Sequence, residues 1–185
     1  MSGISRRNIL ISGGALAGLA ACGNGIGGNG AAKLDARVDA ARDYLRTNFP
    51  GAAETMSKAV GILYVPLVTE AGLFFGGAYG RGALRINDVT VDYYSATQAS
   101  YGIQIGAQQY AHALMFMTQE SLANFRASDG WAAGADLEYA LPDRGGSAGV
   151  ETTTTLAPVI AYVYGQAGFI AGATVKGTKY TRIIP

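Results

Sequence analysis

A single cysteine near the N-terminus is the residue of this 185-residue chain best placed to do chemistry. Cys22 follows the small residues Ala20 and Ala21, which end a short apolar run that begins after Arg6-Arg7. A thiol in this context is typical of an export leader whose cysteine receives acyl chains, and two chains hold a protein stably on a bilayer. The run is too short for a transmembrane helix, which needs about 20 apolar residues. We expect a leader over 1–21 and lipidation at Cys22.

The leader resembles a bacterial lipoprotein signal peptide, with Leu19-Ala20-Ala21-Cys22 as the lipobox. Its start, Ser5-Arg6-Arg7-Asn8-Ile9-Leu10, further resembles a twin-arginine export signal, although Ile9 stands where that pattern favours phenylalanine. A general secretory signal with two arginines is the alternative for the route, and an unmodified cysteine in a flexible tail is the alternative for position 22. The residue after the lipobox is Gly23 and not aspartate. This resembles the signal that sorts lipoproteins to the outer membrane, facing the periplasm. The resemblance implies a lipid-anchored protein of the cell envelope.

Basic residues in two segments are the candidates for contact with lipid phosphates. One group lies in a glycine-rich segment and the other near the C-terminus, where a tyrosine accompanies it. The candidate residues are Arg81, Arg85, Lys176, Lys179, Tyr180 and Arg182. Such cations can hold phosphates while the tyrosine lies at headgroup level. The alternative is a solvated strand edge, where lysine hinders pairing with another sheet.

The residues needed for catalysis or metal binding are missing or isolated. His112 is the only histidine, so histidine-based metal clusters and Cys–His catalysis lack parts, and we expect a structural role for it. Metalloprotease, nucleophile-elbow and P-loop motifs are absent, and a G-x-G-x-x-G match at 25–30 follows no predicted strand. A hydrolase of unfamiliar type would need to bring Asp92, Asp136 and Glu138 together. We expect a protein that is not an enzyme and uses no cofactor or metal.

The composition favours one β-rich domain. Without Arg6 and Arg7 of the leader, 12 Lys and Arg residues face 13 Asp and Glu, so no basic excess exists to neutralise the phosphates of a nucleic acid. Only 15% of residues are charged, while glycine occurs 27 times and tyrosine 11 times, which favours strands. Without its leader the chain has the length of one domain. We place this domain at 33–185, after a flexible Gly/Asn tether over 22–32.

Helices are expected at the start and in the middle of the domain. The first spans 33–49 and ends at Pro50-Gly51. Its apolar stripe, at helical spacing, consists of Leu34, Val38, Ala41 and Leu45. We expect this stripe to pack on a sheet; a helix lying on the bilayer is the alternative, which its mixed charge disfavours. A short helix is expected over 53–58, and Thr118 is suited to cap another over 119–126.

Strands and turns are expected in the rest of the chain. A turn near Gly80-Arg81-Gly82 is expected to divide the segment 72–86 into a pair of strands. A loop is expected over 142–149. The segments are 61–65, 72–86, 89–94, 101–108, 113–117, 131–141, 152–155, 161–164 and 168–175.

Glycines four residues apart recur in three of the strand segments. The pairs are Gly72 and Gly76, Gly102 and Gly106, and Gly168 and Gly172. Residues four apart share one face of a strand, so each pair leaves a bare stripe. Because glycine weakens a strand, its repeated use indicates sharp curvature or the close approach of another backbone or helix. We predict an α+β, β-rich fold: a strongly curved antiparallel sheet or partly closed barrel with helices packed on it. Glycine stripes that line a lipid groove are the alternative.

The same segments carry a family resemblance that extends from about residue 35 to the C-terminus. Its motifs, in order, are Lys58-Ala-Val-Gly-Ile-Leu-Tyr-Val-Pro66, Leu73-Phe-Phe-Gly-Gly-Ala-Tyr-Gly-Arg-Gly-Ala-Leu84, Ser100-Tyr-Gly-Ile-Gln-Ile-Gly-Ala-Gln108, Leu114-Met-Phe-Met-Thr118 and Gly168-Phe-Ile-Ala-Gly172. Together they resemble the SYLF (Ysc84-like) lipid-binding domain, also called the Las17-binding actin-regulator family. The resemblance implies binding of membrane lipids, with phosphoinositides as the eukaryotic ligands. The family usually has Trp where this chain has Val91-Asp92-Tyr93-Tyr94, and the usual C-terminal ending is shortened here.

The combined expectation is a membrane-anchored, non-enzymatic lipoprotein whose SYLF-like domain binds membrane phospholipid. The alternative is an envelope scaffold that binds a protein or a cell-wall polymer and touches lipid only through its acyl anchor. An actin role would need partners that a lipoprotein beyond the bacterial inner membrane would not meet. The sequence indicates neither a nucleic-acid partner nor an oligomeric state.

Overall fold

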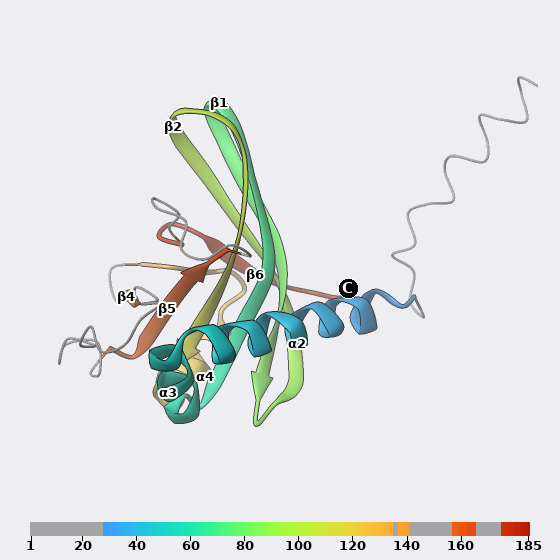
Figure 1. Cartoon of the computed structure of the whole chain (residues 1–185), viewed down its shortest axis with the longest axis vertical. Helices are drawn as coiled ribbons and strands as arrows, with labels where there is room; N and C mark the ends of the chain where they lie inside the picture. The colour runs from blue at the N-terminus through green and yellow to red at the C-terminus, as the bar shows by residue number, and fades with distance from the viewer. Residues whose placement is uncertain (1–27, 135–136, 141–156, 166–174) are drawn as a thin grey trace, which may run out of the picture.

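The computed structural model describes residues 28–134, 137–140, 157–165 and 175–185. The expected leader, Cys22, the segments predicted over 142–149 and 152–155, and all but the last residue of the segment predicted over 168–175 lie outside the described residues. The described part is α+β and β-rich, with helices packed around a curled, half-barrel sheet that is almost entirely antiparallel (Figure 1). The predicted fold class is therefore confirmed.

A single long hairpin forms most of the sheet. Strand β1 (Gly61–Ile86) pairs with β2 (Val89–Phe116) along its whole length. The turn between them is Asn87-Asp88, with φ angles of 50° and 63°, the left-handed conformation that two-residue hairpin loops require. The turn predicted near Gly80-Arg81-Gly82 is wrong, because these residues lie inside β1. The shorter strands predicted between 61 and 117 are parts of these two strands.

The hairpin ribbon folds back on itself halfway along, so that the two halves of β1 meet (Figure 1). A Cβ atom at Gly82 would overlap the carbonyl oxygen of Tyr64, and one at Gly80 would lie 2.8 Å from the carbonyl oxygen of Leu67. Only glycine permits this approach of backbone to backbone. Glycine thus serves close backbone approach at Gly80 and Gly82, where a turn was predicted. The close approach predicted at the glycine pairs four residues apart stays a prediction, because their surroundings lie outside the described residues.

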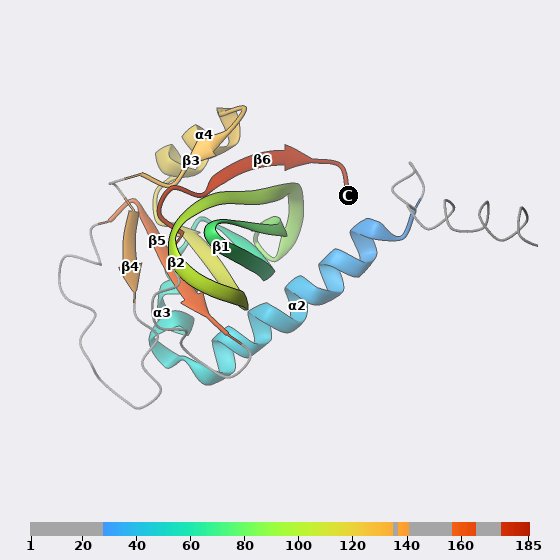
Figure 2. The same cartoon turned by 90° about the horizontal axis from the view of Figure 1, so that it is seen from above.

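Short strands extend the free edge of β2 at both of its ends. Near the hairpin turn, β6 (Lys179–Ile183) pairs with β2, and β3 (Trp131–Ala132) pairs with β6. At the other end β5 (Val159–Tyr164) pairs with β2, and β4 (Leu137–Ala140) lies parallel to β5. Seen from above, the strands curve around a common interior (Figure 2). The C-terminal basic residues, for which a solvated strand edge was the alternative, include Lys179 and Arg182 of β6.

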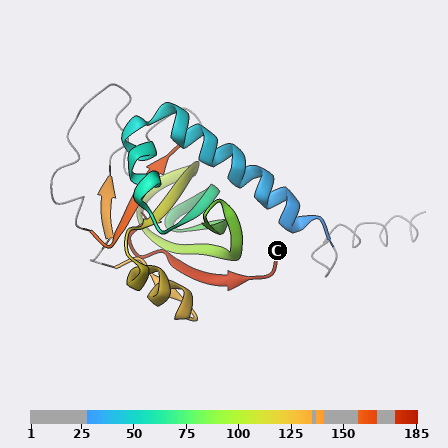
Figure 3. The same ribbon diagram turned by 90° about the horizontal axis from the view of Figure 1, so that it is seen from below.

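Helices cover two sides of this sheet, as Figure 3 shows from below. Helix α2 (Gly30–Asn48) and the adjoining α3 (Pro50–Lys58) lie on the outer face, and α4 (Gln119–Ala127) lies on the other side. Pro50 begins α3 instead of only ending α2, since proline needs no hydrogen-bond partner in the first turn of a helix. The last three residues of the predicted tether, 30–32, are helical. Thr118 caps α4 as predicted.

Two apolar layers result because residues of a strand alternate between faces. The inner layer includes Leu63, Leu114 and Ala161, and the outer layer under α2 and α3 includes Tyr64 and Tyr162. In the predicted stripe of α2, the buried residues are Leu34, Val38 and Leu45, as expected for a helix that packs on a sheet. Within the described part of the chain, no helix combines the length and the apolar character needed to cross a bilayer.

The close approach of the two halves of β1 leads to a first prediction. Gly82→Ala should lower the free energy of unfolding by about 3 kcal/mol, because a methyl group there forces two backbones apart. Gly77→Ala is the matched control, since its Cβ would lie 3.5 Å from the carbonyl oxygen of Gln98, an ordinary contact. Urea unfolding of both variants measures the difference. Equal effects of the two substitutions would show that the fold-back does not require glycine.

Candidate functional site

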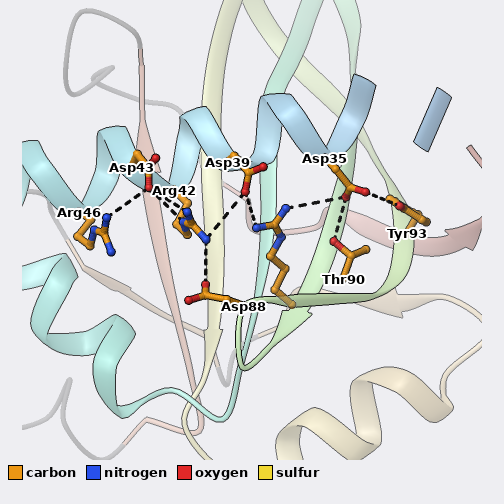
Figure 4. A network of polar contacts seen from close by, with 9 residues as sticks. Asp35, Asp39, Arg42, Asp43, Arg46, Asp88, Thr90 and Tyr93 are labelled. Carbon is orange, nitrogen blue, oxygen red and sulfur yellow. Dashed lines mark hydrogen bonds and ion pairs between the residues drawn. The ribbon is translucent and has the colours of Figure 1, made fainter. Parts of the chain in front are cut away.

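A network of ion pairs and hydrogen bonds joins α2 to the turn end of the hairpin (Figure 4). Arg85 is only 8% exposed, and its Nη1 lies 2.6 Å from Asp39 Oδ1 and its Nη2 4.0 Å from Asp35 Oδ1. Asp35 also accepts hydrogen bonds from Thr90 Oγ1 at 2.9 Å and from the Tyr93 hydroxyl at 2.8 Å. This arrangement fixes the first half of α2 on the sheet and removes Arg85 from the residues free to contact a ligand.

A β-bulge makes the Asp35 site possible. The register shifts between Leu84 and Arg85, so that β2 has one extra residue, Val91, opposite that step. Thr90 and Tyr93, three residues apart, therefore both face α2. Burial, together with the hydrogen bond to Asp35, raises the pKa of Tyr93 to about 12.

The network continues along α2 in weaker, exposed contacts. Arg42 lies 3.1 Å from both Asp43 and Asp88, the second residue of the turn, and Arg46 lies 3.5 Å from Asp43. Exposed pairs of this kind contribute about 0–1 kcal/mol each. The buried Arg85 is consequently the principal polar contact between helix and hairpin.

Tyr180 is part of the core and does not lie at the surface. Its side chain is 1% exposed, and its hydroxyl lies 2.9 Å from Nε2 of His112. The ring also packs near Trp131 and Phe125. The headgroup-level position expected for Tyr180 is wrong. His112 is itself 1% exposed, in keeping with its expected structural role, and burial lowers its pKa to about 3.

Arg182 is exposed, but its polar contacts connect β6 to β2 and α4. Its Nε lies 3.4 Å from Asp92 Oδ1, and its Nη2 donates to the Arg126 carbonyl oxygen at 2.9 Å. Arg126 Nε donates to the other carboxylate oxygen of Asp92 at 2.9 Å. Two arginines thus neutralise Asp92, one of the three acids considered for catalysis. Asp136 and the side chain of Glu138 lie outside the described residues.

Two other candidate cations, Arg81, which is partly exposed, and Lys179, which is exposed, share one outer face of the sheet. Strand pairing aligns residues of β1, β2 and β6 in two outward rows, Tyr79–Thr97–Lys179 and Arg81–Ser95–Thr181. We call these six residues the open face. Their neighbours Ala78, Ala96 and Tyr180 point into the inner core, as alternation requires.

Tyr79 is the residue of the open face that the sequence analysis missed. It is 53% exposed, one of the few large apolar side chains on the described surface. Adjacent strands of a sheet are about 4.8 Å apart. Tyr79 on β1 and Lys179 on β6 lie on either side of Thr97 on β2, so their positions are about 10 Å apart. Among the described residues, no ion pair or side-chain hydrogen bond engages the side chains of Arg81 or Lys179. Lys176 is exposed in the turn before β6, outside the two rows.

The open face presents two cations and a phenol on the sheet. In the described part, no three His, Cys, Asp or Glu side chains come close enough to hold a metal. Such a surface suits the binding of anionic groups by charge and by hydrogen bonding. Fold and face together describe a β-rich domain with two cations on one outer face.

Comparison with known families finds a match for part of the chain. Residues 97–182 match the model of the Ysc84 family, described as Las17-binding protein actin regulator, which confirms the predicted family for this stretch. The matched stretch contains Lys179 and most of β2, whereas α2, Tyr79 and Arg81 lie before it. A search of curated proteins found no match to the chain.

The buried position of Arg85 leads to a prediction about stability. Arg85→Met should lower the free energy of unfolding by about 2 kcal/mol, because it leaves Asp35 and Asp39 without their cation. Arg46→Met removes an arginine from an exposed ion pair on the same helix and should cost no more than about 0.5 kcal/mol. Chemical denaturation of the two variants tests this. Similar small losses would mean that Arg85 does not hold α2 in place.

The depressed pKa of His112 leads to a prediction about pH. The unfolded chain binds this proton near pH 6.5 and the folded protein only near pH 3, so the unfolded state gains the proton first as pH falls. The contribution of neutral His112 to stability is complete above pH 6.5 and decreases between pH 6.5 and 3. Relative to His112→Gln, wild-type stability should fall by up to about 1.4 kcal/mol per pH unit in that window. Parallel stability curves for the two proteins would contradict the burial of a neutral imidazole.

Proposed function

We propose that this protein is a non-enzymatic lipoprotein of the cell envelope whose Ysc84 domain binds the surface of a phospholipid bilayer through the open face. The observation that carries the proposal is the strand register, which brings Tyr79, Arg81 and Lys179 together on one outer face, with Tyr79 and Lys179 exposed and Arg81 partly exposed. The match to the Ysc84 family model over 97–182 supports a binding role for the domain.

The chemistry of the open face fits lipid headgroups. A Lys or Arg close to an anionic membrane surface contributes about 1 kcal/mol, so Arg81 and Lys179 together provide modest attraction. Tyrosine is enriched at membrane interfaces because its ring is apolar and its hydroxyl is polar, which suits the exposed Tyr79. Weak binding of this kind is sufficient for a domain that an anchor keeps near the surface, because tethering raises the effective concentration.

The anchor in this proposal is Cys22, acylated after removal of residues 1–21. The lipobox-like sequence supports it, and Gly23 favours the outer membrane, with the domain in the periplasm. The pairing of Asp92 with two arginines supports a role in binding instead of catalysis. An envelope scaffold that binds a protein or a cell-wall polymer remains the competing function.

Vesicle binding tests the role of the open face. The mature chain carrying Cys22→Ser, which cannot be acylated, should co-sediment with anionic vesicles more than with zwitterionic ones. Adding Arg81→Gln and Lys179→Gln should weaken binding to anionic vesicles about 30-fold, because two cations are lost from the surface. The matched control replaces two exposed cations elsewhere, Arg46→Gln and Lys58→Gln, and should change binding less than threefold.

Two results would count against this function. Absence of binding to both kinds of vesicle would leave the acyl anchor as the only lipid contact. Capture of a specific envelope protein or of peptidoglycan by the same Cys22→Ser chain, abolished by the Arg81 and Lys179 substitutions, would favour the scaffold.

A further inference from the structure

We propose that the domain docks onto the same leaflet that holds its own acylated Cys22, and that one flank of α2 forms part of the docking surface. This inference rests on the proposed function, and it adds both a second set of contact residues and an orientation. Three features support it: the two flanks of α2, the place where the chain enters the domain, and the length of chain before that place.

The two flanks of α2 differ in charge and in what they touch. Asp35 and Asp39 lie on the flank that contacts the hairpin near its turn. At 100° per residue, Lys33 and Arg37 fall on the opposite flank, one turn apart. Both are exposed, and no ion pair or hydrogen bond engages either side chain within the described residues. The helix is therefore anionic toward the hairpin turn and cationic on the side away from it.

The cationic flank borders the open face. The contacts of α2 with Ala83, Arg85 and Tyr93 place the helix across the rows of the sheet nearest the turn. The rows that contain Arg81 and Tyr79 follow directly on the other side of the helix, toward the bend of the ribbon. Figure 1 shows α2 crossing the ribbon between the turn and the bend. The helix flank, with Lys33 and Arg37, and the open face, with Arg81 and Lys179, thus form two adjoining cationic surfaces, which we call the cationic walls.

The chain enters the domain beside these walls. Gly30, the first residue of α2, packs against the C-terminal Pro185, and a Cβ atom at Gly30 would lie 3.0 Å from the Pro185 carbonyl carbon. Pro185 follows β6, the strand that supplies Lys179 to the open face. Figures 2 and 3 both show the start of α2 next to the C-terminus.

The length of chain before α2 restricts the orientation of the domain. Seven residues, 23–29, separate Cys22 from Gly30, a distance of about 15 Å for a flexible coil and about 28 Å for a fully extended chain. An acylated Cys22 would therefore hold the start of α2, and with it both cationic walls, close to the leaflet. Docking on that leaflet needs no rearrangement of the domain, and the four cations Lys33, Arg37, Arg81 and Lys179 all contribute to it.

The contribution of the helix flank is tested with the Cys22→Ser chain. Lys33→Gln with Arg37→Gln should weaken binding to vesicles of phosphatidylcholine and phosphatidylglycerol about 30-fold, about fivefold for each cation lost. The control with Arg46→Gln and Lys58→Gln removes equal charge from exposed positions outside the cationic flank and the open face, and should change binding less than threefold. Equal binding by the two double variants would overturn the inclusion of α2.

The orientation is tested with the acylated full-length protein incorporated in the same vesicles. A fluorophore at Ala40→Cys, next to the cationic flank, should be quenched by a headgroup-attached quencher more strongly than one at Asn48→Cys, at the far end of α2. Protein-bearing vesicles should not cluster protein-free anionic vesicles, as measured by light scattering. Equal quenching or clustering would overturn docking on the anchoring leaflet. If the Cys22→Ser chain binds vesicles through Arg81 and Lys179, those outcomes leave the proposed function intact, whereas no binding by that chain overturns both.

Discussion

The fold depends on the contact between the two halves of β1, where the backbone at Gly80 and Gly82 lies directly on the carbonyl groups of Leu67 and Tyr64. Because the ribbon folds back there, one hairpin forms both sides of a half-barrel with an apolar interior (Figure 1). One edge of β2 stays free at both ends of the hairpin. Strand β6 pairs with it near the turn, and β5 pairs with it at the other end. The extent of the sheet follows from the fold-back.

Helix α2 divides the outer face into a covered part and an open part. Its apolar residues bury the side chains around Tyr64 and Tyr162, and Arg85 connects it to the hairpin through Asp35 and Asp39. Since α2 crosses the sheet near the turn, the rows beyond it leave Tyr79 and Lys179 exposed and Arg81 partly exposed. A contact that stabilises the fold thus also determines which face is available for binding.

Much of the fold could be predicted from the sequence, because helix stripes, the Thr118 cap and glycine-rich strands are local signals. The hairpin turn could not, since Gly80-Arg81-Gly82 has the composition of a turn as well as that of a close approach, and only tertiary contacts decide between them. The candidate site was half predictable. Arg81 and Lys179 meet through a register that no local pattern specifies, and Arg85 is buried by a helix 46 residues away. Gly77, Tyr79 and Arg81 are spaced two residues apart, so in a strand they share one face. This spacing was the signal that would have placed Tyr79 beside Arg81.

The two-residue turn at Asn87-Asp88 also has a consequence for how the chain folds. From that turn outward, each new pair of β1 and β2 closes only a small additional loop, so the ribbon can zip progressively on a microsecond scale. Strands β5 and β6 reach β2 only after long intervening segments, and their arrival carries most of the loop-closure entropy. An early ribbon with unpaired edges, completed late by the C-terminal strands, is the folding route that this topology favours.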